Sequence, residues 1–111
     1  MSDEEELDEM NEKEKEMYYK LRQRFDKKLK KKYGLVYDSL STMDYFYFSI
    51  TYVGKDVKLY IRQYYDDGEI RAFLNFKGED FNFHIIPNDE RLFKLLDAII
   101  LKKQKEKILS W

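Results

Sequence analysis

The sequence predicts an α+β fold: a four-stranded antiparallel β-meander, preceded by a charged N-terminal helix and followed by an amphipathic C-terminal helix. Twelve of the 19 aromatic residues lie between residues 45 and 83, where apolar and polar positions alternate with the period of a strand. The flanking segments have helical spacing instead. We expect an acidic disordered tail over 1–10, a charged helix over 11–34 and a ββββα domain over 35–111.

The net charge of -1 hides a strong segregation of charge along the chain. Residues 1–17 carry nine acids and two lysines, whereas residues 18–34 carry eight bases and one acid. Local positive charge is compatible with a polyanion partner. The chain has no cysteine, which excludes disulfides and thiolate metal sites. The acidic start and short apolar runs predict an intracellular protein with no membrane partner, in a prokaryotic or virus-infected cytoplasm or in the nucleus.

The N-terminal helix is predicted from a stretch without glycine or proline that ends at Gly34, a residue suited to a helix C-terminus. Lysines crowd positions 27–32 near that end and suit the negative end of the helix dipole. The acids between 3 and 16 have two readings: they fold back and mask this lysine run, or they form a solubilising tail. The apolar stripe of the helix recurs every four residues: Met17, Leu21, Phe25, Leu29 and Tyr33.

Four strands are expected after a connecting loop over 35–44. They cover residues 45–53, 56–64, 69–76 and 80–86. Short turns separate them and imply an antiparallel meander: Gly54-Lys55, Asp66-Asp67-Gly68 and Lys77-Gly78.

The C-terminal helix is expected to start at Pro87-Asn88-Asp89-Glu90, which places acids in its first turn. Over 88–108 it carries more apolar surface than one sheet face needs. A homodimer that buries the remainder through this helix is therefore predicted.

One face of the predicted sheet mixes aromatic rings with cations. Rings and guanidinium groups side by side suit unstacked bases and phosphates, and each stacked base contributes about 1–3 kcal/mol without regard to its identity. Two other readings stay open: the tyrosines merely stabilise the sheet, or the N-terminal helix covers this face. His84, the only histidine, is expected to stack or hydrogen-bond. The outward residues are Tyr45, Tyr47, Lys58, Tyr60, Arg62, Tyr64, Arg71, Phe73, Asn75, Asn82 and His84.

The run Ile61-Arg62-Gln63-Tyr64-Tyr65, the step Gly68-Glu69 and the helix start at Pro87 resemble the transcriptional positive cofactor 4 family, Whirly-like single-stranded DNA-binding coactivators. A distant archaeal or viral relative fits equally. The resemblance implies a curved four-stranded sheet that dimerises through helices and binds single-stranded or melted DNA. By the same resemblance Arg62 contacts the backbone, Tyr64 or Tyr65 stacks on bases, and Tyr52 and Lys55 match the aromatic and the lysine of the first hairpin.

We therefore expect sequence-tolerant binding of single-stranded DNA, in transcription or replication, by a protein that is not an enzyme and needs no cofactor. RNA remains an alternative ligand, since no residue identifies a 2′-hydroxyl contact. The main alternative is a protein-interaction module that uses the tyrosine-rich face. A second alternative is a metal-dependent nuclease built on Asp44, Asp56 and Lys58.

Overall fold

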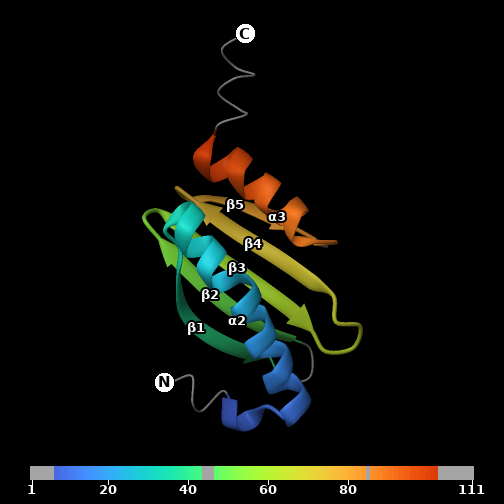
Figure 1. The fold of residues 1–111 in the computed structure, drawn as a ribbon. Coiled ribbons are helices and arrows are strands. Elements are labelled where there is room, and N and C mark those ends of the chain that lie inside the picture. The colour runs from blue at the N-terminus through green and yellow to red at the C-terminus, as the bar shows by residue number, and fades with distance from the viewer. Residues whose placement is uncertain (1–6, 44–46, 85, 103–111) are drawn as a thin grey trace.

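The fold is described by a computed structural model over residues 7–43, 47–84 and 86–102. Five antiparallel strands form one open sheet in the order β1-β2-β3-β4-β5, so the α+β class and the meander are confirmed (Figure 1). The elements are α2 (Glu12–Tyr33), β1 (Val36–Met43), β2 (Tyr47–Gly54), β3 (Val57–Tyr64), β4 (Ile70–Phe76), β5 (Glu79–Phe83), α3 (Asp89–Leu96) and a π-helical turn η1 (Asp97–Leu101).

The predicted strand count of four is wrong, because the segment expected to be a loop over 35–44 contains the edge strand β1. Only Leu40 is fully buried in this strand, and its neighbours are mostly polar. An edge strand with one buried side chain lacks the alternation that reveals a strand in sequence. Backbone pairing with β2 holds it, with an irregularity between Tyr37 and Ser39.

The N-terminal helix is confirmed, and local sequence explains both of its ends. The Asn11 side chain accepts from the Glu14 amide at 2.8 Å, and the Glu14 carboxylate accepts from the Asn11 amide at 2.9 Å. This reciprocal pair satisfies two otherwise unpaired donors at the start of α2. Gly34 ends the helix with a left-handed φ of 70°, which costs glycine little.

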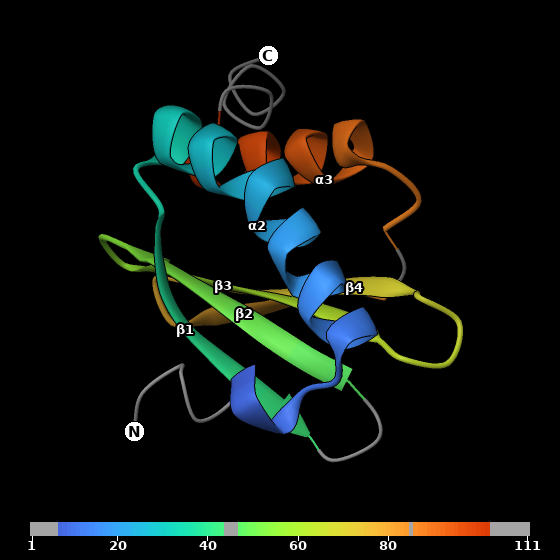
Figure 2. The same cartoon turned by 60° about the horizontal axis from the view of Figure 1, so that its bottom comes forward.

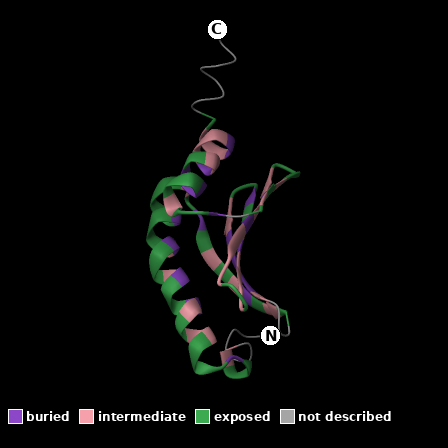
Figure 3. Ribbon diagram, turned by 90° about the vertical axis from the view of Figure 1, so that its right-hand side faces the viewer, coloured by how far each residue is buried: buried purple, intermediate pink, exposed green. Residues whose placement is uncertain are grey.

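Helices α2 and α3 pack on the same, apolar face of the sheet (Figures 2 and 3). The Phe25 ring of α2 lies 6.3 Å from the Phe93 ring of α3, and the Tyr18 ring lies 6.3 Å from Phe48 of β2. Arg24 and Asp89 form an ion pair between the helices. The possibility that α2 covers the aromatic outward face is therefore wrong.

The C-terminal helix begins where expected: Asn88 accepts a hydrogen bond from the Arg91 amide at 2.8 Å. Its described part ends at the π-helical turn, and residues 103–108 of the predicted helix lie outside the described residues. Leu92 and Leu96 are fully buried, and Phe93 packs against α2. Much of the apolar surface that motivates a homodimer is thus covered within one chain, and dimerisation stays a prediction. Among the helices described, none is long and apolar enough to cross a membrane.

The predicted tail over 1–10 is too long. Residues 7–9 form a helical turn, and Met10 is only 5% exposed in the core. Residues 1–6 lie outside the described part. The acids between 7 and 16 stand at the start of α2, and the lysine run stands at its end (Figure 1). A 22-residue helix spans about 33 Å, so these acids do not fold back over the lysines.

Candidate nucleic-acid interface

The face of the sheet that no described element covers carries the predicted rings and cations. Side chains alternate along a strand, so burying Val57, Leu59 and Ile61 under the helices turns the intervening positions of β3 outward. Register then brings residues of neighbouring strands together on this surface, which we call the open face. The predicted site residues described on it are Tyr47, Lys58, Tyr60, Arg62, Tyr64, Arg71, Phe73 and Asn75.

The two arginines of the open face stack on its aromatic rings. The Arg62 guanidinium carbon lies 4.9 Å from the ring centre of Tyr47 and 4.1 Å from that of Phe73. The Arg71 guanidinium lies 4.7 Å from the Tyr64 ring, and its Nε donates to Glu69 Oε1 at 2.6 Å. This hydrogen bond to Glu69 raises the pKa of Arg71. Cations and rings are therefore held in place before any ligand arrives.

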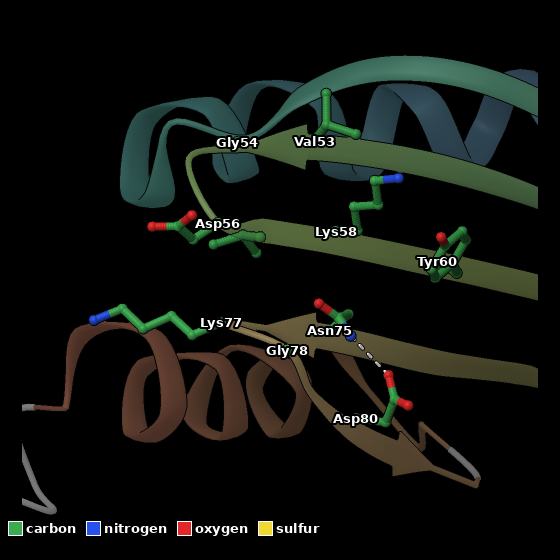
Figure 4. Close-up of a pocket in the computed structure, with 10 residues that line it drawn as sticks. Val53, Gly54, Asp56, Lys58, Tyr60, Asn75, Lys77, Gly78 and Asp80 are labelled. Atoms are coloured by element: carbon green, nitrogen blue, oxygen red, sulfur yellow. Dashed lines mark hydrogen bonds between the residues drawn. The ribbon is translucent and has the colours of Figure 1, made fainter.

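Tyr60 stands between two hollows of the open face. The larger, of about 830 Å³, lies toward the β2–β3 and β4–β5 turns and includes Lys58, Asn75 and Asp80 in its lining (Figure 4). The smaller, of about 150 Å³, lies toward β1 and includes Arg62. Within the described residues the Tyr60 ring has no stacking partner and its hydroxyl no hydrogen bond. Tyr47, Phe73 and Tyr64 of the same face, by contrast, each lie against a guanidinium group.

Lysines gather at the end of the molecule where the two hairpin turns meet the end of α2. The Lys77 amide donates to the Asp56 carbonyl at 2.9 Å and joins the two turns. A Cβ atom added to Gly54 would lie 3.4 Å from the Gly34 carbonyl oxygen, so α2 ends beside the β2–β3 turn. Lys77 and Lys102 line one hollow of about 200 Å³. We call this end the basic pole: Lys28, Lys30, Lys31, Lys32, Lys55, Lys58, Lys77 and Lys102.

The basic pole also holds acids, among them Asp56, Asp80 and Asp97. Lys32 pairs with Asp97 at 3.5 Å. In the part of the chain that the structure describes, Lys30 and Lys31 have no carboxylate partner. Lys77 and Lys102 carry no motif in sequence, and only the tertiary arrangement brings them together at one hollow.

Two predicted site residues are not on the open face, and their assignment is corrected. Tyr52 is fully buried on the helix-covered face of β2. Tyr65 packs on the same core, with its ring 6.2 Å from that of Phe48. Strand alternation puts both on the core side, contrary to the match with the family. Tyr45 lies outside the described residues, whereas Lys55 is exposed in its turn and His84 is exposed beyond β5.

The Tyr52 hydroxyl belongs instead to a polar network between α2 and the sheet. It donates to Asp26 Oδ1 at 2.6 Å, and Asp26 Oδ2 accepts from Arg22 Nε at 2.9 Å. The Arg22 guanidinium lies 3.5 Å from the ring centre of Tyr37. Burial, and then the hydrogen bond to Asp26, raises the pKa of Tyr52. Tyr52 therefore has a structural role that positions α2.

The nuclease hypothesis gains no support from the described geometry. Asp56 sits in the β2–β3 turn with a φ of 61°, and Asp44 lies outside the described residues. Across residues 7–43, 47–84 and 86–102, no three histidine or carboxylate side chains gather as metal ligands.

Comparison with known proteins shows no family for this chain. The resemblance to the positive cofactor 4 family stays a prediction that depends on a short run in β3, and the five strands observed differ from the four it implies. No protein-family model, curated protein or solved structure matches the chain.

Proposed function

We propose that the open face binds single-stranded nucleic acid, with bases stacked on its rings and phosphates directed toward the basic pole. One observation carries the proposal: both helices pack on the apolar face, so the face with Tyr47, Tyr60 and Phe73 is left uncovered by the described residues. Flat rings next to cations bind bases and phosphates with little regard to sequence. DNA is the ligand that the resemblance favours.

The contacts indicate different roles for the arginines and the lysines of the proposed interface. Arg62 and Arg71 already stack on rings, and Arg71 is paired with Glu69. They shape the aromatic surface more than they supply free charge. Lys30, Lys31 and Lys58 are exposed, and within the described residues they have no carboxylate partner. These unpaired lysines are therefore better suited than the two arginines to contact phosphates. A lysine that neutralises a phosphate releases condensed counterions, which favours binding.

A protein-docking face is the second candidate, and one observation favours it. The open face carries charges of both signs: Arg71 pairs with Glu69, and Lys58 and Asp80 line the same hollow. Tyrosine and arginine on a near-neutral surface are common at protein interfaces. Absence of oligo-dT binding at low salt would favour this candidate.

Replacing Tyr60 with alanine is expected to weaken binding of a fluorescent oligo-dT about 5- to 150-fold, because one stacked base contributes about 1–3 kcal/mol. Fluorescence anisotropy at low salt measures the change. Tyr19→Ala is the matched control, since Tyr19 is 51% exposed on α2, away from the open face. Equal affinities for the two variants would exclude stacking on Tyr60.

Neutralising Lys30 and Lys31 together is expected to reduce the salt dependence of binding. Each phosphate contact on a single strand contributes about 0.7 to the slope of log affinity against log salt, so the double Lys→Gln variant should lose up to about 1.4. Lys13→Gln with Lys20→Gln removes the same charge from the other end of α2 and should leave the slope near that of the wild type. A titration of oligo-dT binding from low to moderate salt measures it. Identical slopes in the two variants would remove the basic pole from the proposal.

A further inference from the structure

The smaller hollow of the open face contains polar atoms that lack partners. Ser49 is 6% exposed, and its Oγ makes no hydrogen bond to any described residue; the buried Arg62 Nε likewise has none. Buried polar groups are nearly always paired, because an unpaired one keeps its full desolvation cost. Two such groups in one hollow therefore indicate that something beyond the described residues satisfies them.

The two groups are neighbours. Ser49 of β2 stands directly opposite Arg62 of β3, and both line the hollow of about 150 Å³. Tyr47 and Tyr60 line the same hollow. Polar atoms that lack partners thus lie between two rings of the proposed stacking surface.

The donor set defines what the hollow accepts. Arg62 Nε–H only donates, and the Ser49 hydroxyl donates as readily as it accepts. Both can bind a single oxygen acceptor. The positive guanidinium disfavours a cation, and a water molecule suits the hollow when no ligand is bound.

We propose that Ser49 and Arg62 form a subsite for an oxygen acceptor of the bound strand. The inference rests on the proposed function, since the strand must first lie on the open face. Two sources carry such an oxygen: the carbonyl of a base and the phosphate. A base stacked on Tyr60 brings its edge to the hollow, where thymine offers a carbonyl oxygen, whereas adenine offers only ring nitrogens beside an amino group that cannot accept. The subsite then gives an otherwise tolerant surface a preference for carbonyl-bearing bases over adenine.

The test compares oligo-dT, oligo-dA and an abasic oligomer of the same length, by anisotropy, on wild type and Ser49→Ala. If a base carbonyl occupies the subsite, the dT/dA affinity ratio falls about three- to tenfold in Ser49→Ala, the worth of one hydrogen bond. If a phosphate oxygen occupies it, all three oligomers weaken alike, by a similar factor. Because stacking within free oligo-dA affects both proteins equally, it cancels when the dT/dA ratio of Ser49→Ala is compared with that of the wild type.

Two further variants keep the result interpretable. Ser39 of β1 does not line the hollow, and its hydroxyl donates to Asp38 at 3.1 Å, so Ser39→Ala should leave all affinities unchanged. Arg62→Lys keeps the positive charge but has no Nε–H. It also loses the stacking of the guanidinium on Tyr47 and Phe73, so all three affinities should fall, and the dT/dA ratio should change as it does in Ser49→Ala.

Stability gives an independent readout. Because the Ser49 hydroxyl bonds to no other described residue, Ser49→Ala removes no protein–protein hydrogen bond among them and should unfold at the same temperature as wild type or higher. Unchanged binding of all three oligomers by Ser49→Ala, with oligo-dT still bound, would overturn the subsite alone. No binding of any oligomer to the wild type would overturn the proposed function and the subsite with it.

Discussion

Replacing Phe25 with alanine is expected to lower the free energy of unfolding by about 3–5 kcal/mol, the usual cost of removing a buried aromatic ring. Phe25 is fully buried, and its ring lies 6.3 Å from that of Phe93. It therefore joins α2 to α3 above the apolar face. Urea denaturation followed by circular dichroism measures the loss.

The matched control is Tyr19→Ala in the same helix, which should change stability by less than about 0.5 kcal/mol because Tyr19 is exposed. A loss of less than about 1 kcal/mol for Phe25→Ala would show that α2 does not pack on the sheet in solution. The open face would then no longer be defined, and the proposed nucleic-acid interface depends on that packing.

Local periodicity was enough to predict which side of each central strand faces the core. Val57, Leu59 and Ile61 alternate with Lys58, Tyr60 and Arg62, and the structure buries the first set and turns out the second. Alternation predicts the core side correctly here because a central strand is hydrogen-bonded on both edges and must bury one of its two faces. The start and the end of α2 could also be predicted from the sequence, because a helix cap depends on residues that are close together in sequence.

The features that could not be predicted depend on contacts between residues that are far apart in sequence. β1 is an edge strand with a single fully buried side chain, so its pattern resembles that of a loop. The basic pole forms because the end of α2 reaches the two hairpin turns, which no pattern near Lys77 or Lys102 indicates. That the Ser49 hydroxyl has no partner among the described residues is likewise a property of the packed sheet, which no local pattern indicates.

Asp26→Ala is the second substitution with a large expected effect, a loss of about 2–3 kcal/mol. Asp26 is the acceptor for the fully buried Tyr52 hydroxyl and for Arg22. Its removal leaves that hydroxyl without a partner, which costs about 1–3 kcal/mol. The ion pair with Arg22 adds little, because both side chains are 31% exposed. Asp38→Ala is the control, since the exposed Asp38 accepts from its neighbour Ser39 and, among the residues that the structure describes, from no other.

A double-mutant cycle measures how much of the lost stability comes from leaving the Tyr52 hydroxyl without its acceptor. In Tyr52→Phe the hydroxyl is absent, so adding Asp26→Ala to it should cost less than Asp26→Ala costs in the wild type. Chemical denaturation of the four proteins measures the difference. Strict additivity would mean that the hydrogen bond between Tyr52 and Asp26 does not stabilise the fold.

Alkaline unfolding tests the same contact by a different route. Burial, and then the hydrogen bond to Asp26, raises the pKa of Tyr52 in the folded state. A raised folded pKa gives stability that is complete below the unfolded value, about 10 for tyrosine, and that is lost as pH rises toward the folded value. Wild-type stability should therefore fall above about pH 10, and Tyr52→Phe should fall less steeply there. Equal slopes for the two proteins would show that the Tyr52 phenol reaches water, and α2 would then not be anchored to β2 through this network.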